Sequence, residues 1–413
     1  MNIVMSLVGI VVLLGIAFIL CNNRRAINWR TVMGALAIQS LLGCFVLYLP
    51  IGQEILGSIS AGVSSVISYA NNGIAFLFGD AARFKLGFIF AINVLPIIIF
   101  FSSFIAVLYY LGIMKWIIRL IGGLLQRLLG VSRPEAMSAT ANIFVGFTEA
   151  PLVVRPFIAT MSKSELFTIM TSGLASVAGS VLAGYAGLGI KIEYLIAASF
   201  MAAPGGILMS KLMYPETETT KQDITDLAAE TDKPTNVLDA AATGASSGLQ
   251  LALNVGAMLL AFIGLIALIN GIIGWVGGLA GIDDLTLEML LGIILQPLAF
   301  IIGVPWQEAS VAGSFIGQKI VVNEFVAYVN FAPYITGEML IDGAPMSIRT
   351  QAIISFALCG FANLSSIAIL LGGLGALAPN RRHELAQLGI RAVIAGTLSN
   401  LMSATLAGLF IAL

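Results

Sequence analysis

Two glutamates, Glu149 and Glu324, lie in stretches of the chain that are otherwise apolar. A charged side chain at the centre of a bilayer costs roughly 3 kcal/mol on insertion scales, so such a residue normally faces a polar cavity. The two acids also have matching contexts. Gly130-Val131 precedes the first and Gly303-Val304 precedes the second, and after three further residues each pair is followed by Glu-Ala. A repeated unit with one buried acid in each copy is typical of a secondary transporter.

The composition indicates a membrane protein. Of the 413 residues, 59% are hydrophobic and 10% are charged, which is more apolar than a soluble domain requires. The net charge of -1 argues against a nucleic-acid partner and leaves the lipid bilayer as the expected surroundings. With His383 as its single histidine and three scattered cysteines, the chain has no pattern for a histidine triad, a His-rich metal site or a disulfide framework.

The apolar runs predict an all-α membrane protein with about eight transmembrane helices, two re-entrant helical hairpins and interfacial helices, arranged as an inverted internal repeat. The first run lacks a basic leader region and a clear cleavage site, so we interpret it as a retained membrane helix. Interfacial helices are expected at 53–70, 115–130 and 287–302. The expected spans are 3–20, 31–49, 87–113, 166–189, 193–213, 249–274, 350–375 and 388–412.

The two hairpins are predicted at 134–160, which contains Glu149, and at 305–335, which contains Glu324. Each segment is apolar but is broken near its middle by Gly, Pro, Asn or Thr. Non-helical backbone at membrane depth is tolerated only where it is buried in protein or lines a cavity. The alternative is a kinked spanning helix with a functionally silent acid. The matched repeat and the cost of burying the charge favour the hairpin.

Two later helices contain breaks, at 173–184 (GLASVAGSVLAG) and at 360–366 (GFANLSS). Small and polar residues midway along a helix free backbone carbonyls and supply hydroxyl or amide groups, as in the discontinuous helices that form transporter sites. The alternative is close helix packing, for which small residues are also used. For 173–184 both interpretations stay open. For 360–366 an Asn and two Ser exceed what packing requires.

Basic residues mark the side of the membrane on which each loop lies. The positive-inside rule places three basic clusters in the cytoplasm. They are Arg24, Arg25 and Arg30; Lys115, Arg119, Arg127 and Arg133; and Arg381 and Arg382. The N-terminus is then outside, the first hairpin enters from the cytoplasm and the second from outside. The expected units are 1–113 (mainly scaffold), 114–213 (first repeat unit), 214–236 (acidic cytoplasmic linker), 237–280 (scaffold spanning helix) and 281–413 (second repeat unit).

Three motifs occur in this framework: GFTEAPL at 146–152, NEFVAY at 323–328 and GFANLSS at 360–366. Together, and in this order, they resemble the concentrative nucleoside transporter family over nearly the whole chain. The resemblance implies a multi-pass homotrimer in the bacterial inner membrane, with a scaffold and a mobile transport domain in each subunit that give alternating access. It also implies nucleoside import by symport with sodium or, in some branches, protons. No organic cofactor is expected.

The resemblance also implies roles for individual residues. The base is expected to contact Thr148 and Glu149, directly or through water, and Val181 through apolar atoms. Glu324, Asn363 and Ser366 match ribose contacts, and Phe361 lines the same site. Where Phe147 stands the family usually has Gln, so a different base preference is expected. The implied sodium ligands are the side chains of Asn142 and Ser176 and the carbonyls of Val145 and Val177.

The chemistry of these residues agrees with a neutral ligand that has a flat base and a polar ribose, and with a hard cation that prefers oxygen ligands. Two other classes compete with a symporter. A membrane-embedded enzyme would use the acids with Asn and Ser groups, but the sequence shows no Asp-rich metal motif and no signature of an activated nucleophile. A passive channel needs a continuous pore, whereas hairpins and broken helices around one midplane site favour alternating access.

Overall fold

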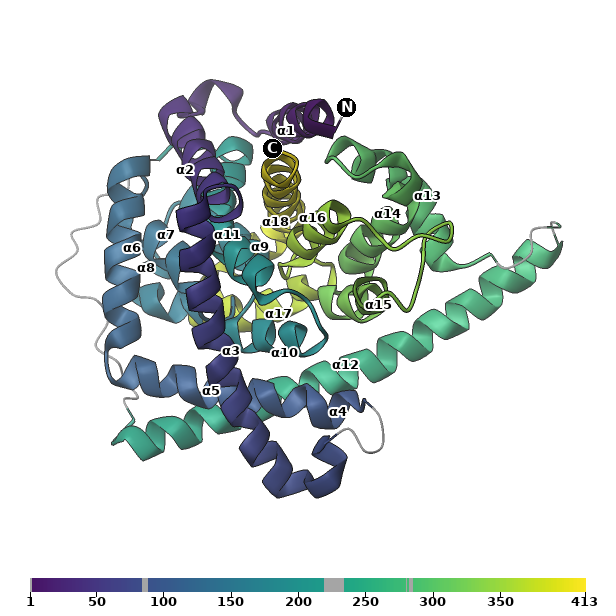
Figure 1. Ribbon diagram of the computed structural model, residues 1–413. Helices are drawn as coiled ribbons and strands as arrows, with labels where there is room; N and C mark the ends of the chain where they lie inside the picture. Colours follow the sequence, from purple (N-terminus) through teal and green to yellow (C-terminus); the bar gives the residue numbers. More distant parts are fainter. Residues whose placement is uncertain (1, 84–87, 219–233, 280, 282–284) are drawn as a thin grey trace.

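The computed structural model of the protein describes residues 2–83, 88–218, 234–279, 281 and 285–413 (Figure 1). Within these residues every regular element is a helix, apart from an isolated bridge between Ile341 and Ala344. The predicted all-α class is therefore confirmed. Most of the predicted linker 214–236, namely residues 219–233, lies outside the described residues.

Two of the N-terminal helices begin at residues suited to a helix start. Asn28 caps α2, because its side chain accepts from the backbone N–H groups of Arg30 and Thr31. Pro50 opens α3, where its missing N–H has no helical partner to lose. The segment 53–70 is thus part of a longer helix of 29 residues. These elements are α1 (Asn2–Ile19), α2 (Trp29–Leu47), α3 (Pro50–Phe78), α4 (Phe90–Asn93), α5 (Leu95–Tyr110) and α6 (Ile113–Leu129).

The first repeat unit contains a folded-back segment, a broken helix and a continuous helix. Ser–Glu pairs start two of its helices: Glu165 and Ser162 form both bonds of a capping box, and Glu135 Oε2 accepts from Ser132 N over 2.9 Å. Its elements are α7 (Arg133–Ala141), η3 (Ala150–Val154), α8 (Arg155–Ile158), α9 (Lys163–Ala175), α10 (Gly179–Gly187) and α11 (Ile192–Met213).

The second unit repeats this order. The helix α13 meets α14, the first helix of the predicted second hairpin, at a bend of 116°. Its elements are α13 (Leu287–Ile301), α14 (Trp306–Val321), α15 (Glu324–Thr336), α16 (Ile348–Leu358), α17 (Ser365–Leu377) and α18 (Arg382–Ile411).

In the described part of the chain, six helices are long and apolar enough to cross a membrane, or seven if the bent pair α13–α14 counts as one span. Two predicted spans do not reach that length as single helices. The apolar part of α1 is short, and the 350–375 span is divided into α16 and α17 by its break. Each of the eight predicted ranges nevertheless coincides with a helix or with a broken pair of helices.

The helix α12 (Val237–Leu279) differs most from the prediction of a span at 249–274, because it runs for 43 residues. At 1.5 Å per residue that is roughly 64 Å, about twice the hydrocarbon thickness of a bilayer. Figure 1 shows it lying obliquely along one side of the molecule, next to α5. Gly244 and Gly248 make this contact close, because a Cβ at Gly248 would lie 2.7 Å from Ser102 Cβ. Ser103 Oγ also donates to Ala241 O over 2.8 Å.

Candidate substrate and ion site

Four non-helical segments meet inside the molecule: the connections within the two hairpins and the breaks of the two broken helices. Gly179 N donates to Phe144 O over 3.0 Å, which joins the first break to the first hairpin. Leu364 N donates to Ile320 O over 3.1 Å, which joins the second break to the second hairpin. Buried backbone groups need such partners. The predicted hairpins and helix breaks therefore supply hydrogen-bond partners to one another's backbone groups.

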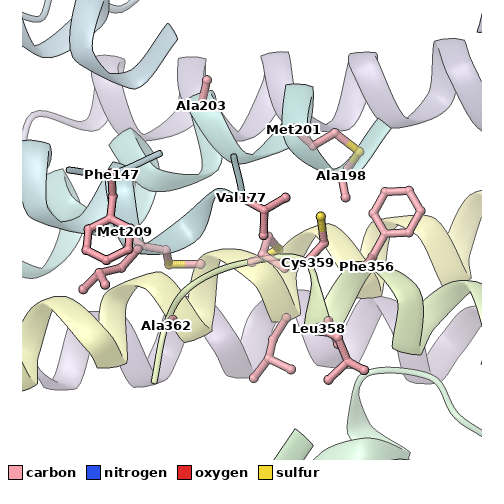
Figure 2. Packing of buried hydrophobic residues seen from close by; sticks show 14 of the residues in the cluster. Phe147, Val177, Ala198, Met201, Ala203, Met209, Phe356, Leu358, Cys359 and Ala362 are labelled. Atoms are coloured by element: carbon pink, nitrogen blue, oxygen red, sulfur yellow. The ribbon is translucent and has the colours of Figure 1, made fainter. Parts of the chain in front are cut away.

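The two breaks are also joined to each other. Phe361 N donates to Ser176 O over 3.2 Å. In Figure 2, Val177 from the first break lies in the same packed region as Cys359 and Ala362 from the second. The segment 173–184, for which the sequence left packing and a binding site open, is therefore packed closely against the second break.

Glu324 is the first residue of α15 and is 5% exposed. Both of its carboxylate oxygens have a donor: Tyr185 Oη donates to Oε1 over 3.1 Å, and Asn363 Nδ2 donates to Oε2 over 3.0 Å. A helix N-terminus also favours negative charge. The buried acid is therefore held by groups from α10 and from the second break, with lone pairs left to accept from a ligand.

Asn363 has its orientation fixed by three bonds. Its Nδ2 faces Glu324, while its Oδ1 accepts from Ser366 N over 2.8 Å and from Ser365 Oγ over 2.7 Å. Ser366 is buried in the first turn of α17. The three residues that were predicted to bind ribose, Glu324, Asn363 and Ser366, are thus brought together.

The connection within the first hairpin differs from that of the second. Eight residues, 142–149, separate α7 from η3, whereas only Val322 and Asn323 separate α14 from α15. Glu149, near the end of the longer connection, has an exposed side chain, while Glu324 is enclosed. Thr148 faces α17, since a Cβ at Gly373 would lie 3.2 Å from Thr148 Cγ2.

Phe147 is 8% exposed and packs against Phe361, with ring centroids 5.2 Å apart. On its other side, a Cβ at Gly173 would lie 2.7 Å from Phe147 Cβ. Phe147 therefore packs between the ring of Phe361 and helix α9. Val181 is buried in α10.

The residues that were predicted to bind sodium lie where α7 and α9 both end. Asn142 caps α7, with Nδ2 donating to Ser138 O over 2.9 Å, and its Oδ1 is buried with no hydrogen-bond partner among the described residues. The hydroxyl of Ser176 donates to the backbone carbonyl of Asn142 and lies 3.5 Å from Val177 O. Val145 follows Phe144, whose carbonyl binds the same break.

This oxygen-rich arrangement suits a small cation. Two helices present their C-terminal, negative ends there, and the orphaned amide oxygen of Asn142 is a ready ligand.

Three polar residues that lie beside the proposed sites were not predicted from the sequence. Tyr185 binds Glu324 and packs against Tyr328, with ring centroids 4.3 Å apart. Lys319 and Asn400 bind each other beneath the second break. Lys319 could have been selected from the sequence, because it is a charged residue inside the second predicted hairpin. Tyr185 and Asn400 carried none.

Two helical units of the same element order, with broken helices around an enclosed acid, are typical of a membrane transporter. A sequence model of the family described as "Na+ dependent nucleoside transporter C-terminus" matches residues 194–408. The corresponding N-terminus model matches residues 8–81, and a model described as "Nucleoside recognition" matches residues 91–191. The chain belongs to the Na+-dependent, or concentrative, nucleoside transporter family, so the resemblance seen in the motifs is confirmed.

Several relatives are similar over nearly the whole of this chain. "Nucleoside permease NupC" of Helicobacter pylori is 54% identical over 99% of this chain and 98% of its own. "Sodium/nucleoside cotransporter 1" of Rattus norvegicus is 40% identical over 98% of this chain and 63% of its own. Among solved structures, CNTnw in an inward-facing substrate-bound state is 58% identical, with a TM-score of 0.95 over 99% of this chain and 98% of its own.

Proposed function

We propose that this protein imports nucleosides across the bacterial inner membrane by symport with sodium. The observation that carries the proposal is the pairing of two sites. Glu324, held by Tyr185 and Asn363, lies in the second unit, and Phe361 N from the same site bonds to Ser176 O at the cation pocket. A nucleoside site and a cation site that share one backbone hydrogen bond are suited to coupled binding.

In this proposal the ribose hydroxyls donate to the free lone pairs of Glu324, and Asn363 and Ser366 supply further polar contacts. The base lies against Phe361 and Val181, because a flat ring prefers apolar walls with a few polar groups at its edge. Thr148 and Glu149 supply those edge groups from the first hairpin, and the exposed position of Glu149 leaves it free to meet a ligand.

The sodium ion is bound by oxygen atoms from Asn142, Val145, Ser176 and Val177. The buried Oδ1 of Asn142, which has no hydrogen-bond partner among the described residues, supports this assignment. The description of the matching family models and the name of the rat relative support sodium over protons.

Contacts among the predicted cytoplasmic segments support the proposed topology. Thr31 Oγ1 donates to Leu129 O over 2.8 Å, which joins the first two basic segments, and Arg381 Nη1 donates to Ile158 O over 3.0 Å, which joins the third to the end of the first predicted hairpin. On α1, Ser6 near the chain start accepts from Arg349 Nη2 over 2.9 Å, at the base of α16. We infer that the N-terminus is outside and that the hairpins enter from opposite faces.

The transport domain is proposed to comprise the two repeat units, 114–213 and 281–413, which move against a scaffold containing α5 and α12. The small-residue contact of α12 with α5 supports a rigid scaffold pair. CNTnw has been solved in inward-facing, outward-facing and intermediate states, which supports alternating access for this chain. A homotrimer in the lipid bilayer is proposed from family membership.

The decisive experiment is uptake of radiolabelled uridine into proteoliposomes. An inward sodium gradient is expected to drive accumulation, while an equal potassium gradient and a pH gradient without sodium are expected to give only background uptake. Accumulation driven by pH alone would replace sodium with protons. Equilibration without accumulation under any gradient would indicate a channel.

A further inference from the structure

Asn400 lies in the middle of α18 and contacts both helix breaks at once. Its Nδ2 donates to Ala175 O over 2.6 Å and to Cys359 O over 2.9 Å. Ala175 ends α9 and Cys359 caps α16, so both carbonyls belong to the C-terminal ends of half-helices, where intrahelical partners are missing. One amide group, 2% exposed, therefore satisfies the end of a half-helix in each repeat unit.

Lys319 sets the orientation of that amide. Its ammonium, on a residue 1% exposed, donates to Asn400 Oδ1 over 2.6 Å and to Ala357 O over 2.8 Å. An ammonium group only donates, so the amide oxygen must face Lys319 and the amide nitrogen must face the two carbonyls. The positive charge also lies at the C-terminal end of α16, where a cation is favoured.

Two glycines allow α18 to approach both breaks. A Cβ at Gly360 would collide with the side-chain amide of Asn400. One turn away on α18, a Cβ at Gly396 would lie 3.1 Å from both Ala362 Cβ and Leu174 Cβ. The two breaks are thus packed against the same short stretch of one helix, with no room for side chains between them.

The chain neighbours of these carbonyls belong to the two proposed sites. Ala175 precedes Ser176 of the cation site, and Cys359 precedes the segment that carries Phe361 and Asn363 of the nucleoside site. We propose that Asn400, oriented by Lys319, is a positioning residue that couples occupancy of the cation site to the shape of the ribose site. The inference rests on the proposed function and extends it by naming the residue that links the two sites.

The proposed coupling runs along these hydrogen bonds. A cation bound at Ser176 fixes the end of α9, and with it the carbonyl of Ala175. The Asn400 amide binds that carbonyl and the carbonyl of Cys359 with the same nitrogen, so its position is shared by both half-helices. Ordering one half-helix therefore orders the other, and Asn363 is held in the position that serves Glu324.

The test is Asn400→Asp in the purified full-length protein. The carboxylate keeps an acceptor for Lys319 but removes both donated bonds to the half-helix ends. The measurement is the dissociation constant of uridine without sodium divided by that with saturating sodium, obtained by titration calorimetry. Coupling between two sites is typically about 5–150-fold. We expect a wild-type ratio in this range and a several-fold smaller ratio for the variant, in which the Phe361 N–Ser176 O bond still joins the two sites.

The matched control is Thr405→Val on the same helix, a buried residue whose hydroxyl donates only within α18, to Leu401 O. Its ratio is expected to equal that of the wild type. If Asn400→Asp fails to fold, the double variant Lys319→Met/Asn400→Leu, which removes the buried polar pair together with its donated bonds, is measured in its place. It is expected to show the same loss of coupling.

A residue that only stabilises the fold would weaken uridine binding equally with and without sodium. An unchanged ratio in the Asn400 variants would therefore overturn the inference while leaving sodium symport intact. A wild-type ratio of 1 would overturn both the sodium assignment and the inference. As an internal check, linkage requires that uridine change the sodium affinity by the same factor.

Discussion

Tyr185 in the first repeat unit donates its phenolic hydrogen to Oε1 of Glu324 in the second, over 3.1 Å. The bond joins residues 139 positions apart in the sequence and places one wall of the proposed nucleoside site in each unit. A ligand held by Glu324 is thus also held, through Tyr185, by α10. Neither unit can form this site alone.

Replacing Glu324 by Gln is expected to cause a large loss of uridine affinity. The change keeps the shape of the side chain but removes the charged acceptor, and hydrogen bonds to charged groups are worth about 1.5–3 kcal/mol, or roughly 10–160-fold in affinity. Calorimetry measures the loss. Glu338→Gln, at an exposed acid beyond α15, is the control and is expected to bind normally. Normal uridine binding by the Glu324 variant would contradict the ribose-acceptor role.

Tyr185→Phe keeps the ring that packs on Tyr328 and removes only the hydroxyl that binds Glu324. Leaving one carboxylate oxygen without its donor costs about 1–3 kcal/mol, so we expect uridine affinity to fall at least fivefold. Tyr328→Phe is the control, because that hydroxyl donates to Ser355 O over 2.6 Å instead. It is expected to lower thermal stability and to leave affinity nearly unchanged. Equal affinity losses in the two variants would argue against a specific role for Tyr185.

Asn142→Ala removes the orphaned amide oxygen that is proposed to bind sodium. The sodium concentration for half-maximal uptake is therefore expected to rise by roughly tenfold, since one charge-assisted contact is worth about 1.5–3 kcal/mol. Uptake at increasing sodium concentrations measures the shift. In Thr140→Val, a buried neighbour in α7 loses a hydroxyl that donates only to Ala136 O, and the sodium dependence should not change. A shared shift in both variants would point to the fold of α7 rather than to ion binding.

Phe147→Gln is expected to change base preference. Phe147 packs against the ring of Phe361, which is proposed to stack on the base, so replacing it by an amide is expected to weaken a stacking contact that tolerates different bases. Purine nucleosides should therefore compete better in the wild type than in the variant. Inhibition of labelled uridine uptake by adenosine and by cytidine gives the order. An unchanged order would mean that Phe147 only fills the space between Gly173 and Phe361.

Lys211→Met is expected to lower stability strongly. Lys211 Nζ lies 2.5 Å from Glu135 Oε1, and both side chains are buried, so the change leaves an uncompensated buried charge that costs about 3–5 kcal/mol. Lys163→Met is the control, because its pair with Glu384 spans 3.6 Å with a side chain 54% exposed, where about 0–1 kcal/mol is expected. Melting temperatures of the solubilised protein compare the two. Equal shifts would contradict a structural role for the Glu135–Lys211 pair.

The order of elements could be predicted from the sequence because bilayer thickness limits span length and because the two units repeat. The breaks in the broken helices were visible in their small and polar residues, and Glu324, Asn363 and Ser366 do lie together. The length of α12 was not predicted, because residues 237–248 are small and only weakly apolar and their partner is α5, far away in the sequence.

The polar residues around the helix breaks could be predicted only in part, because some of their partners are far away in the sequence. Asn400 looks like one polar residue in an ordinary spanning helix, and its importance depends on two carbonyls that lie 225 and 41 positions away in the chain. The different exposure of the Glu149 and Glu324 side chains was also not predicted, because the matching sequences around the two residues suggested similar surroundings. It accompanies the unequal lengths of the connections within the two hairpins.

The backbone bonds from Gly179 to Phe144, from Phe361 to Ser176 and from Leu364 to Ile320 hold the binding residues in one connected body. A site that keeps its shape while it turns from one side of the membrane to the other has the same intrinsic affinity on each side. The direction of net flux is then decided by the concentrations in the two compartments, and not by the protein. In the proposed symport, a reversed ion gradient drives nucleosides out of a cell through the same site.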